Sequence, residues 1–269
     1  MTERDLRLPP GATVDPARAG WRYLSFRIER LNGPMRLGSD DRETAIVVLG
    51  GGGVRVDDRE LPGRASVWDG RPSAAYIPAG RSADVAPIGE VVEVAIAEAP
   101  AENTGEMLFI GPEDVRVEVR GAGNATRQIN HIITPDVPAD RLELVEVYTP
   151  SGNWSSWPPH KHDTDDMPRE AILEEIYHYR LRRPEAWGIQ RLYRADGSRD
   201  LLWPVRDSET VIVPDGYHPF VAIHGEDAYY LNALAGDVRT MACSFHPDLA
   251  SVMDQWPELE PDPRVPLVG

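Results

Sequence analysis

The chain has 269 residues, enough to bury a sizeable core, and carries 44 acidic side chains against 28 basic ones, a net charge of -16. Such an acidic surface favours solubility and excludes a nucleic-acid-binding function, because no basic stripe is present to neutralise phosphates. The sequence contains no apolar stretch of about 18 residues, the first residues lack the apolar core of a signal peptide, and Cys243 is the single cysteine. We therefore expect a cytoplasmic protein without a membrane segment or an internal disulfide.

Short apolar and β-branched runs, separated by glycine, proline and charged residues, predict strands in the first part of the chain. They lie at 21–31, 43–49, 54–56, 65–68, 74–78, 90–99, 105–110 and 115–120. The run from Gly50 to Gly53 follows a strand, but neither a helical pattern nor a Lys-Ser/Thr pair comes after it. We therefore expect a hairpin turn at these glycines and not a phosphate-binding loop.

A second series of strands is predicted after the glycine-rich segment 121–124. Its members lie at 127–134, 141–150, 175–180, 188–194, 210–214, 220–224, 228–235 and 239–245. Two β-rich halves are thus predicted, residues 1–125 and 126–269, and only 246–256 has a short helical pattern. The first half has no His-x-His pair, so we expect it to carry no metal.

Two histidines on the predicted strand near residue 160 indicate a metal site. Alternate residues of a strand face the same side, so His160 and His162 point together. An acidic loop then leads to Glu175 at the start of an alternating strand, and His218 follows a Pro-x-Gly turn. We expect His160, His162, Glu175 and His218 to bind one divalent metal ion. Zinc is the first expectation, with manganese, iron, nickel and cobalt left open.

Several neighbouring residues offer alternatives to this ligand set. Glu170 and Glu174 are rivals for the carboxylate ligand, and Glu175 is preferred because it begins the β-like run. His178 has the opposite strand parity and is expected to face away from the metal. Lys161 also points away, and we expect it to form a structural ion pair.

Six segments together resemble the bicupin isomerase family that includes the 5-deoxy-glucuronate isomerases of inositol catabolism and, more distantly, the 5-keto-4-deoxyuronate isomerases of pectin breakdown. They are RGAGNATRQINHI at 120–132, SGNWSSWPPHKHD at 151–163, LEEIYHYR at 173–180, GIQRLY at 188–193, VPDGYHP at 213–219 and YYLNALAG at 229–236. The likeness extends over most of residues 20–250. It implies an all-β bicupin fold, in which two cupin-type β-barrels of the double-stranded β-helix (jelly-roll) kind follow one another with little helix.

The resemblance also implies a function. It predicts a metal-dependent aldose-ketose isomerase that acts on a small sugar acid, 5-deoxy-D-glucuronate, to give 5-dehydro-2-deoxy-D-gluconate. A metal ion suits this chemistry, since a Lewis acid stabilises the negative charge that develops on the substrate oxygens. Association into a homo-oligomer through a barrel edge is a further expectation. A cupin metal-dependent dioxygenase and a non-catalytic sugar-binding cupin are the alternatives.

The strand at 175–180 also supplies the predicted catalytic residues, Glu175, Tyr177 and Tyr179, because these three share one face. Either tyrosine could donate a hydrogen bond or a proton to a substrate oxygen. The substrate carboxylate calls for an arginine, whose planar fork matches two oxygens. The predicted substrate-binding residues are Arg180, Gln190 and Arg191, and Arg127 is another candidate for the carboxylate.

Overall fold

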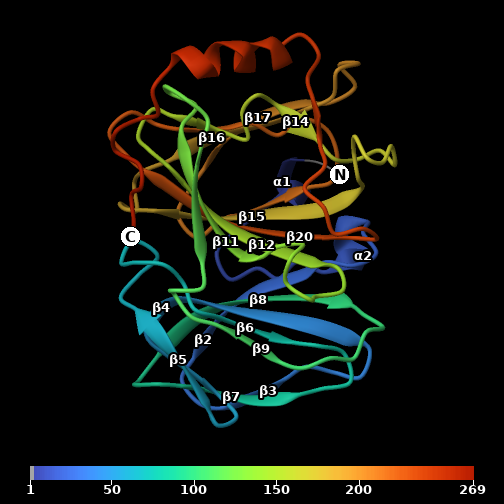
Figure 1. Cartoon of the computed structure of the whole chain (residues 1–269), viewed down its shortest axis with the longest axis vertical. Coiled ribbons are helices and arrows are strands. Elements are labelled where there is room, and N and C mark those ends of the chain that lie inside the picture. Colours follow the sequence, from blue (N-terminus) through green and yellow to red (C-terminus); the bar gives the residue numbers. More distant parts are fainter. Residues whose placement is uncertain (1–2) are drawn as a thin grey trace.

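The computed structural model describes residues 3–269 and confirms the all-β class (Figure 1). Helices within this range are short: α1 (Glu3–Leu6), α2 (Pro16–Ala19) and a 3-10 helix (Ala250–Glu258). None of them has the length and apolar character needed to span a bilayer. The strands are arranged in a lower and an upper group in Figure 1.

The lower group is an eight-stranded antiparallel sheet built from the first predicted series. Its main path runs β2-β8-β4-β6-β9, and β3, β5 and β7 attach beside β4. The strands are β2 (Ser25–Leu31), β3 (Met35–Leu37), β4 (Arg42–Val56), β5 (Arg59–Arg64), β6 (Ala74–Ile77), β7 (Ala83–Pro87), β8 (Val92–Pro100) and β9 (Leu108–Ile110). Their inner faces enclose an aliphatic core that includes Ile46, Val48 and Val94.

The glycine run at 50–53 corrects a prediction. Strand β4 continues through it, and the hairpin turn comes later, at Asp57 and Asp58. Gly51 and Gly53 have φ angles of 112° and 109°, which side-chain-bearing residues rarely adopt. The glycines let one strand bend and pair first with β6 and β8 and then with β5 and β7. Residues 65–68, also predicted as a strand, form a turn in which the Ser66 hydroxyl donates to Asp69.

The upper group contains a seven-stranded sheet in the order β1-β18-β15-β20-β12-β11-β10. A four-stranded sheet, β13-β19-β16-β17, and the pair β14-β21 complete it. The bounds are β1 (Arg7–Leu8), β10 (Arg116–Arg120), β11 (Arg127–Ile133), β12 (Leu142–Thr149), β13 (Trp154–Ser155), β14 (His160–Lys161), β15 (Leu173–Leu181), β16 (Gly188–Tyr193), β17 (Asp200–Val205), β18 (Thr210–Val213), β19 (Phe220–Ala222), β20 (Ala228–Gly236) and β21 (Ser244–Phe245). The strand predicted at 239–245 is thus reduced to its last two residues.

The two groups share one hydrophobic core. It contains Phe26 and Val47 from the lower group together with Ile132 and Tyr148 from the upper one. A buried ion pair between Arg64 of β5 and Glu146 of β12 also crosses the junction. The hydroxyl of Tyr229 donates to Glu146 at 2.8 Å, so this carboxylate is well satisfied.

The C-terminal segment returns across the upper group. The helical pattern predicted at 246–256 forms the 3-10 helix, the red coil at the far end of the upper group from the lower sheet (Figure 1). The chain then runs back, and the backbone N–H groups of Leu267 and Val268 donate to the side chain of Gln128 on β11. This path lays the 3-10 helix beside the upper group's cavity, described next.

Candidate metal and substrate site

Strand β15 supplies the central carboxylate of the site. It lies between β18 and β20, with Glu175 opposite Val213 on one side and Leu234 on the other. Its alternation points Glu175 and Tyr177 into a cavity of the upper group, whereas His178 faces the lower group and packs on Phe26. The sequence predicted this orientation of His178.

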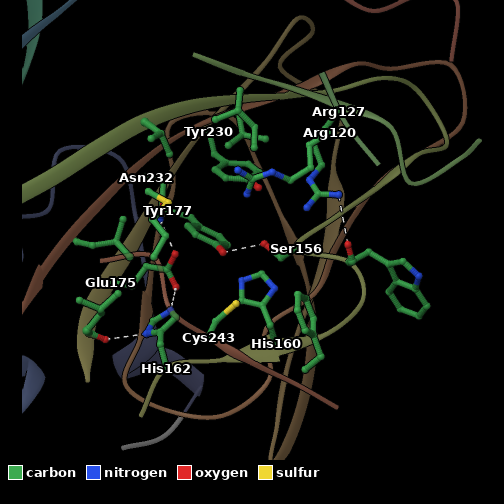
Figure 2. Close-up of a pocket in the computed structure, with 18 of the residues that line it drawn as sticks. Arg120, Arg127, Ser156, His160, His162, Glu175, Tyr177, Tyr230, Asn232 and Cys243 are labelled. Carbon is green, nitrogen blue, oxygen red and sulfur yellow. Dashed lines mark hydrogen bonds and ion pairs between the residues drawn. The ribbon is translucent and has the colours of Figure 1, made fainter. Parts of the chain in front are cut away.

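Three side chains that could bind a metal ion come together here: His162, Glu175 and His218 (Figure 2 labels the first two). One ligand atom from each lies within 4.8 Å of the others, and all three residues are buried. The Nε2 atoms of His162 and His218 lie 2.9 Å and 3.2 Å from one oxygen of Glu175. A set of two imidazoles and one carboxylate suits zinc and other divalent transition metals.

Neighbouring groups hold these three side chains in place. The Nδ1 atoms of His162 and His218 lie 3.0 Å and 2.9 Å from the carbonyl oxygens of Leu173 and Gly216. Each Nδ1–H therefore donates outward and leaves Nε2 as the ligand atom. Asn232 donates to the other Glu175 oxygen at 2.7 Å. The buried Nε2 of His218 has no hydrogen-bond partner among residues 3–269, as expected of an atom meant for a metal.

The charges of the site agree with a cation site. Burial alone would raise the pKa of the Glu175 carboxyl, but the charges of His218 and His162 lower it to about 2. Burial lowers the pKa of His218, with His162 acting in the same direction. Glu175 is therefore ionised and His218 is neutral at neutral pH, which are the protonation states that a metal ion requires. Burial lowers the pKa of His162, but the charge of Glu175 outweighs it and raises that pKa, so a metal ion would have to displace a proton from this ring.

His160 lies beside this group but outside the three-atom cluster. Its ring centroid is 4.8 Å from that of His218 and 6.5 Å from that of His162. Burial, together with the neighbouring histidines, lowers its pKa well below the usual value, so the ring is neutral. His160 pairs with Phe245 across β14 and β21 and lines the cavity.

The rival carboxylates have other partners. Glu174 accepts hydrogen bonds from the backbone N–H groups of residues 22–24 and so fixes the N-terminal segment to β15. Glu170 accepts from the backbone N–H groups of Asp163 and Thr164 and from Lys161. Lys161 also donates to Asp163 at 2.5 Å, so it forms the predicted structural ion pair and faces away from the histidines.

A cavity of about 140 Å³ opens beside this group, and His162 and Glu175, but not His218, are among its lining residues. Its walls come from β10, β11, β12, β15 and β20, and Met253 and Trp256 of the 3-10 helix form one side. The lining residues are Arg120, Arg127, Ile129, Val145, Val147, Ser156, Trp157, His160, His162, Leu173, Glu175, Tyr177, Tyr230, Asn232, Leu234, Met241, Cys243, Phe245, Met253 and Trp256. Apolar walls with a few polar groups are typical of small-molecule sites.

The two predicted catalytic tyrosines differ in position. Tyr177 lines the cavity, its ring stacks on Tyr230 at 4.5 Å, and its hydroxyl lies 2.8 Å from that of Ser156 (Figure 2). Burial raises the pKa of Tyr177 well above its usual value, so the phenol stays protonated. Tyr179 lies deeper and donates to Gln190. Gln190 in turn donates to the carbonyl oxygens of His218 and Pro219, so it supports the histidine loop and does not line the cavity.

Two predicted substrate-binding arginines lie outside the cavity. Arg180 has the parity of His178 and pairs with Glu93 of the lower group. Arg191 pairs with Asp200 at 2.9 Å in an exposed position. The arginines that line the cavity are Arg127, the remaining candidate, and Arg120.

Several cavity residues were not singled out from the sequence. Ser156, Tyr230 and Asn232 are among them, and so is Cys243, whose thiol pKa burial raises to about 11. The alternation of β20 places Tyr230 and Asn232 on one face, which is a usable signal. The register that sets this face opposite Glu175 and Tyr177 is not readable from one sequence.

The sequence matches a known protein family over most of its length. Residues 7–252 match the KduI/IolB family. A 5-deoxy-glucuronate isomerase from Geobacillus kaustophilus is 39% identical over 248 residues, which are 90% of each chain. One from Listeria monocytogenes is 34% identical over 262 residues, which are 93% of this chain and 96% of that one.

Solved structures also resemble this chain. The crystal structure of an IolB-like protein from Salmonella typhimurium LT2 superposes with a TM-score of 0.86 at 32% identity, covering 92% of this chain and 99% of that one. An oxalate decarboxylase from Lactobacillus farciminis superposes with a TM-score of 0.64 at 10% identity, covering 95% and 94%. The second likeness shows a shared fold alone.

Proposed function

This chain belongs to the KduI/IolB family and is an isomerase, and we propose that it converts 5-deoxy-D-glucuronate to 5-dehydro-2-deoxy-D-gluconate in inositol catabolism. The observation that carries the proposal is the buried group of His162, Glu175 and His218 beside a small, mostly apolar cavity. The chain's relatives are named 5-deoxy-glucuronate isomerases. An isomerase acts on a small molecule. The cytoplasmic location and the homo-oligomer stay predictions.

For the fold, we infer two cupin-type barrels, residues 1–125 without a metal and residues 126–269 with one. Support comes from the separate lower sheet and from the fold shared with oxalate decarboxylase. Strands β1 and β10 lie before residue 126 but pair with β18 and β11. The boundary in sequence therefore differs from the grouping of strands in space.

For the metal, we infer one divalent ion held by His162, Glu175 and His218, with His160 as the fourth ligand and zinc as the first candidate. When bound, such an ion would polarise the carbonyl and adjacent hydroxyl oxygens of the substrate, where negative charge develops. The ionised Glu175, the neutral His218 and its unpartnered Nε2 support this assignment.

The reaction moves one hydrogen from C2 to C1 and one proton from the C2 oxygen to the C1 oxygen. Tyr177 is suited to help, because its protonated phenol faces the cavity and Ser156 orients it. We assign Tyr177 as a hydrogen-bond donor to a substrate oxygen. Tyr179 and Gln190 do not contact the substrate in this proposal; they position His218, because Tyr179 donates to Gln190 and Gln190 donates to the backbone carbonyl of His218.

Elemental analysis of the purified protein, combined with an NMR assay, tests the proposal. We expect stoichiometric metal and turnover of 5-deoxy-D-glucuronate but not of 5-keto-4-deoxyuronate. His162→Ala should lose both metal and activity, because it removes one of the three central ligands. The exposed His224→Ala is the matched control and should retain both.

Other results would contradict the proposal. Full activity of His162→Ala, or of thoroughly metal-free protein, would exclude the metal site from catalysis. Bound iron with oxygen consumption would favour the dioxygenase. Metal without turnover of either sugar acid would favour a different substrate.

A further inference from the structure

Two arginines face each other on one wall of the cavity. Arg120 of β10 and Arg127 of β11 are direct partners in the strand register, and both line the cavity (Figure 2). Like charges in directly opposed positions of a sheet repel each other. Nearby anionic groups would offset this repulsion.

Only one of the two arginines has such a group within residues 3–269. The Nε and Nη2 atoms of Arg120 donate to the two oxygens of Glu118, at 2.7 Å and 3.1 Å. Arg127 has no acidic partner in that range, and the residue is buried, with 6% of its surface exposed. Burial lowers the pKa of Arg127 to about 10, and the charge of Arg120 acts in the same direction. The guanidinium is therefore a buried cation that lacks an anion.

The hydrogen bonds of Arg127 show which edge of its guanidinium group is free. Its Nη1 donates to the carbonyl oxygens of Ala125 and Trp157, at 3.1 Å and 3.2 Å. Its Nε and Nη2 donate to no group among the described residues. This is the same edge that Arg120 uses to hold the carboxylate of Glu118, so the protein itself provides an example of the geometry.

We propose that Arg127 binds the carboxylate group of the sugar-acid substrate through its Nε and Nη2 edge, with Arg120 reinforcing the positive charge of this wall. This inference rests on the proposed function and names the residue that recognises the acid. Figure 2 shows Arg127 and Glu175 on opposite sides of the cavity, with Tyr177 and His160 between them. The carboxylate and the aldehyde of 5-deoxy-D-glucuronate are likewise at opposite ends of a six-carbon chain. Binding at Arg127 thus directs the aldehyde toward His162, Glu175 and His218.

Calorimetric titration with two matched probes tests the inference without turnover. D-glucuronate carries the carboxylate, and D-glucuronamide replaces it with a neutral amide. We expect the unmodified protein to bind D-glucuronate about 10- to 100-fold more tightly than D-glucuronamide, as charge-assisted hydrogen bonds predict. Arg127→Gln should bind both probes equally weakly. Arg206→Gln, which changes an exposed arginine, is the control and should keep the full preference.

Arg127→Lys keeps the inference testable if Arg127→Gln does not fold. Lysine retains the charge but not the fork, so we expect weaker binding of D-glucuronate with the preference for the acid preserved. Unchanged affinity of both variants for D-glucuronate, or no preference in the unmodified protein, would overturn the inference.

Kinetics separate this inference from the proposed function. If 5-deoxy-D-glucuronate is turned over, Arg127→Gln should raise KM by about 10- to 100-fold with a smaller change in kcat. An unchanged KM would refute the role of Arg127 and leave the isomerase intact. If the substrate is not turned over but the probes behave as expected, the proposed reaction fails and the acid-binding site stands.

Discussion

Asn232 holds the carboxylate of Glu175 on the side away from the histidines. Among residues 3–269, its side chain donates to Glu175 and to no other side chain, and a second bond to the carbonyl of Ile176 fixes the amide. We expect Asn232→Ala to weaken binding of the proposed metal ion about 10- to 100-fold, because the carboxylate of Glu175 is then free to rotate. Competition with a chromogenic chelator measures the effect.

The exposed Asn103→Ala, at a position far along the chain from the site, serves as the control for Asn232→Ala and should leave the metal affinity unchanged. A metal affinity of Asn232→Ala equal to that of the unmodified protein would mean that β15 alone orients Glu175.

Glu143 is a second buried carboxyl group on β12. It lies opposite Leu234, which in turn lies opposite Glu175, so the three form one row across the sheet. Neither of its oxygens accepts a hydrogen bond of normal geometry in the described part of the chain, and burial raises its pKa from 4.5 to about 7, against the opposing effects of Arg239 and the Thr240 backbone. The folded protein therefore retains a proton that the unfolded chain loses between these pH values.

Folding stability should accordingly fall as the pH rises from 4.5 through 7. A shift of this size corresponds to roughly 3 kcal/mol. We expect Glu143→Gln to remove this loss, so that its free energy of unfolding changes less than that of the unmodified protein between pH 5 and pH 8. Urea titrations at both pH values measure the difference, and equal slopes for the two proteins would show that Glu143 does not titrate there.

Asp262 is a second point, besides Gln128, at which the C-terminal segment is attached. This carboxylate accepts a hydrogen bond from Asn153 at 3.0 Å, and Arg264 pairs with it. The bond from Arg264 lowers the pKa of Asp262 from 3.8 to about 2. The stabilisation is therefore present above pH 3.8 and is lost as the pH falls through 2.

We expect Asp262→Asn to lower the free energy of unfolding by about 1–2 kcal/mol at pH 7 and by less at pH 3. Urea titrations at the two pH values give the comparison. Asp254→Asn, on the exposed side of the 3-10 helix, should have little effect at either pH. A loss of equal size at both pH values would mean that the carboxylate's charge is irrelevant to the attachment.

Individual strands differ in how well the sequence predicts them. Alternation along β15 placed Glu175 and Tyr177 on one face of the strand and His178 on the other. The same rule puts Arg180 on the face of His178, and the prediction of Arg180 as a substrate-binding residue overlooked this. The bend of β4 at Gly51 was not predicted, because a glycine run equally suits a turn and a close approach of two backbones. Register between strands far apart in sequence, which brings Asn232 to Glu175, needs the structure.

Across the whole molecule, the Arg64–Glu146 pair joins the two groups of strands. Both side chains are almost completely buried. We expect Arg64→Ala to lower the free energy of unfolding by about 3–5 kcal/mol, because it leaves the charge of Glu146 uncompensated. The double change Arg64→Met with Glu146→Leu should recover most of this loss. Calorimetry measures both, and a mild effect of Arg64→Ala would mean that the junction tolerates a lone carboxylate.

Strand β1 is synthesised long before the strand with which it pairs. Arg7 pairs with Val211, and Leu8 with Thr210, so about two hundred more residues must be translated before the partners of these early residues exist. The lower sheet uses only residues 25–110 and can close much sooner. The nascent chain therefore carries a finished sheet with Leu8 still uncovered in front of it, which makes this segment, still without its strand partner, a natural place for a chaperone to bind.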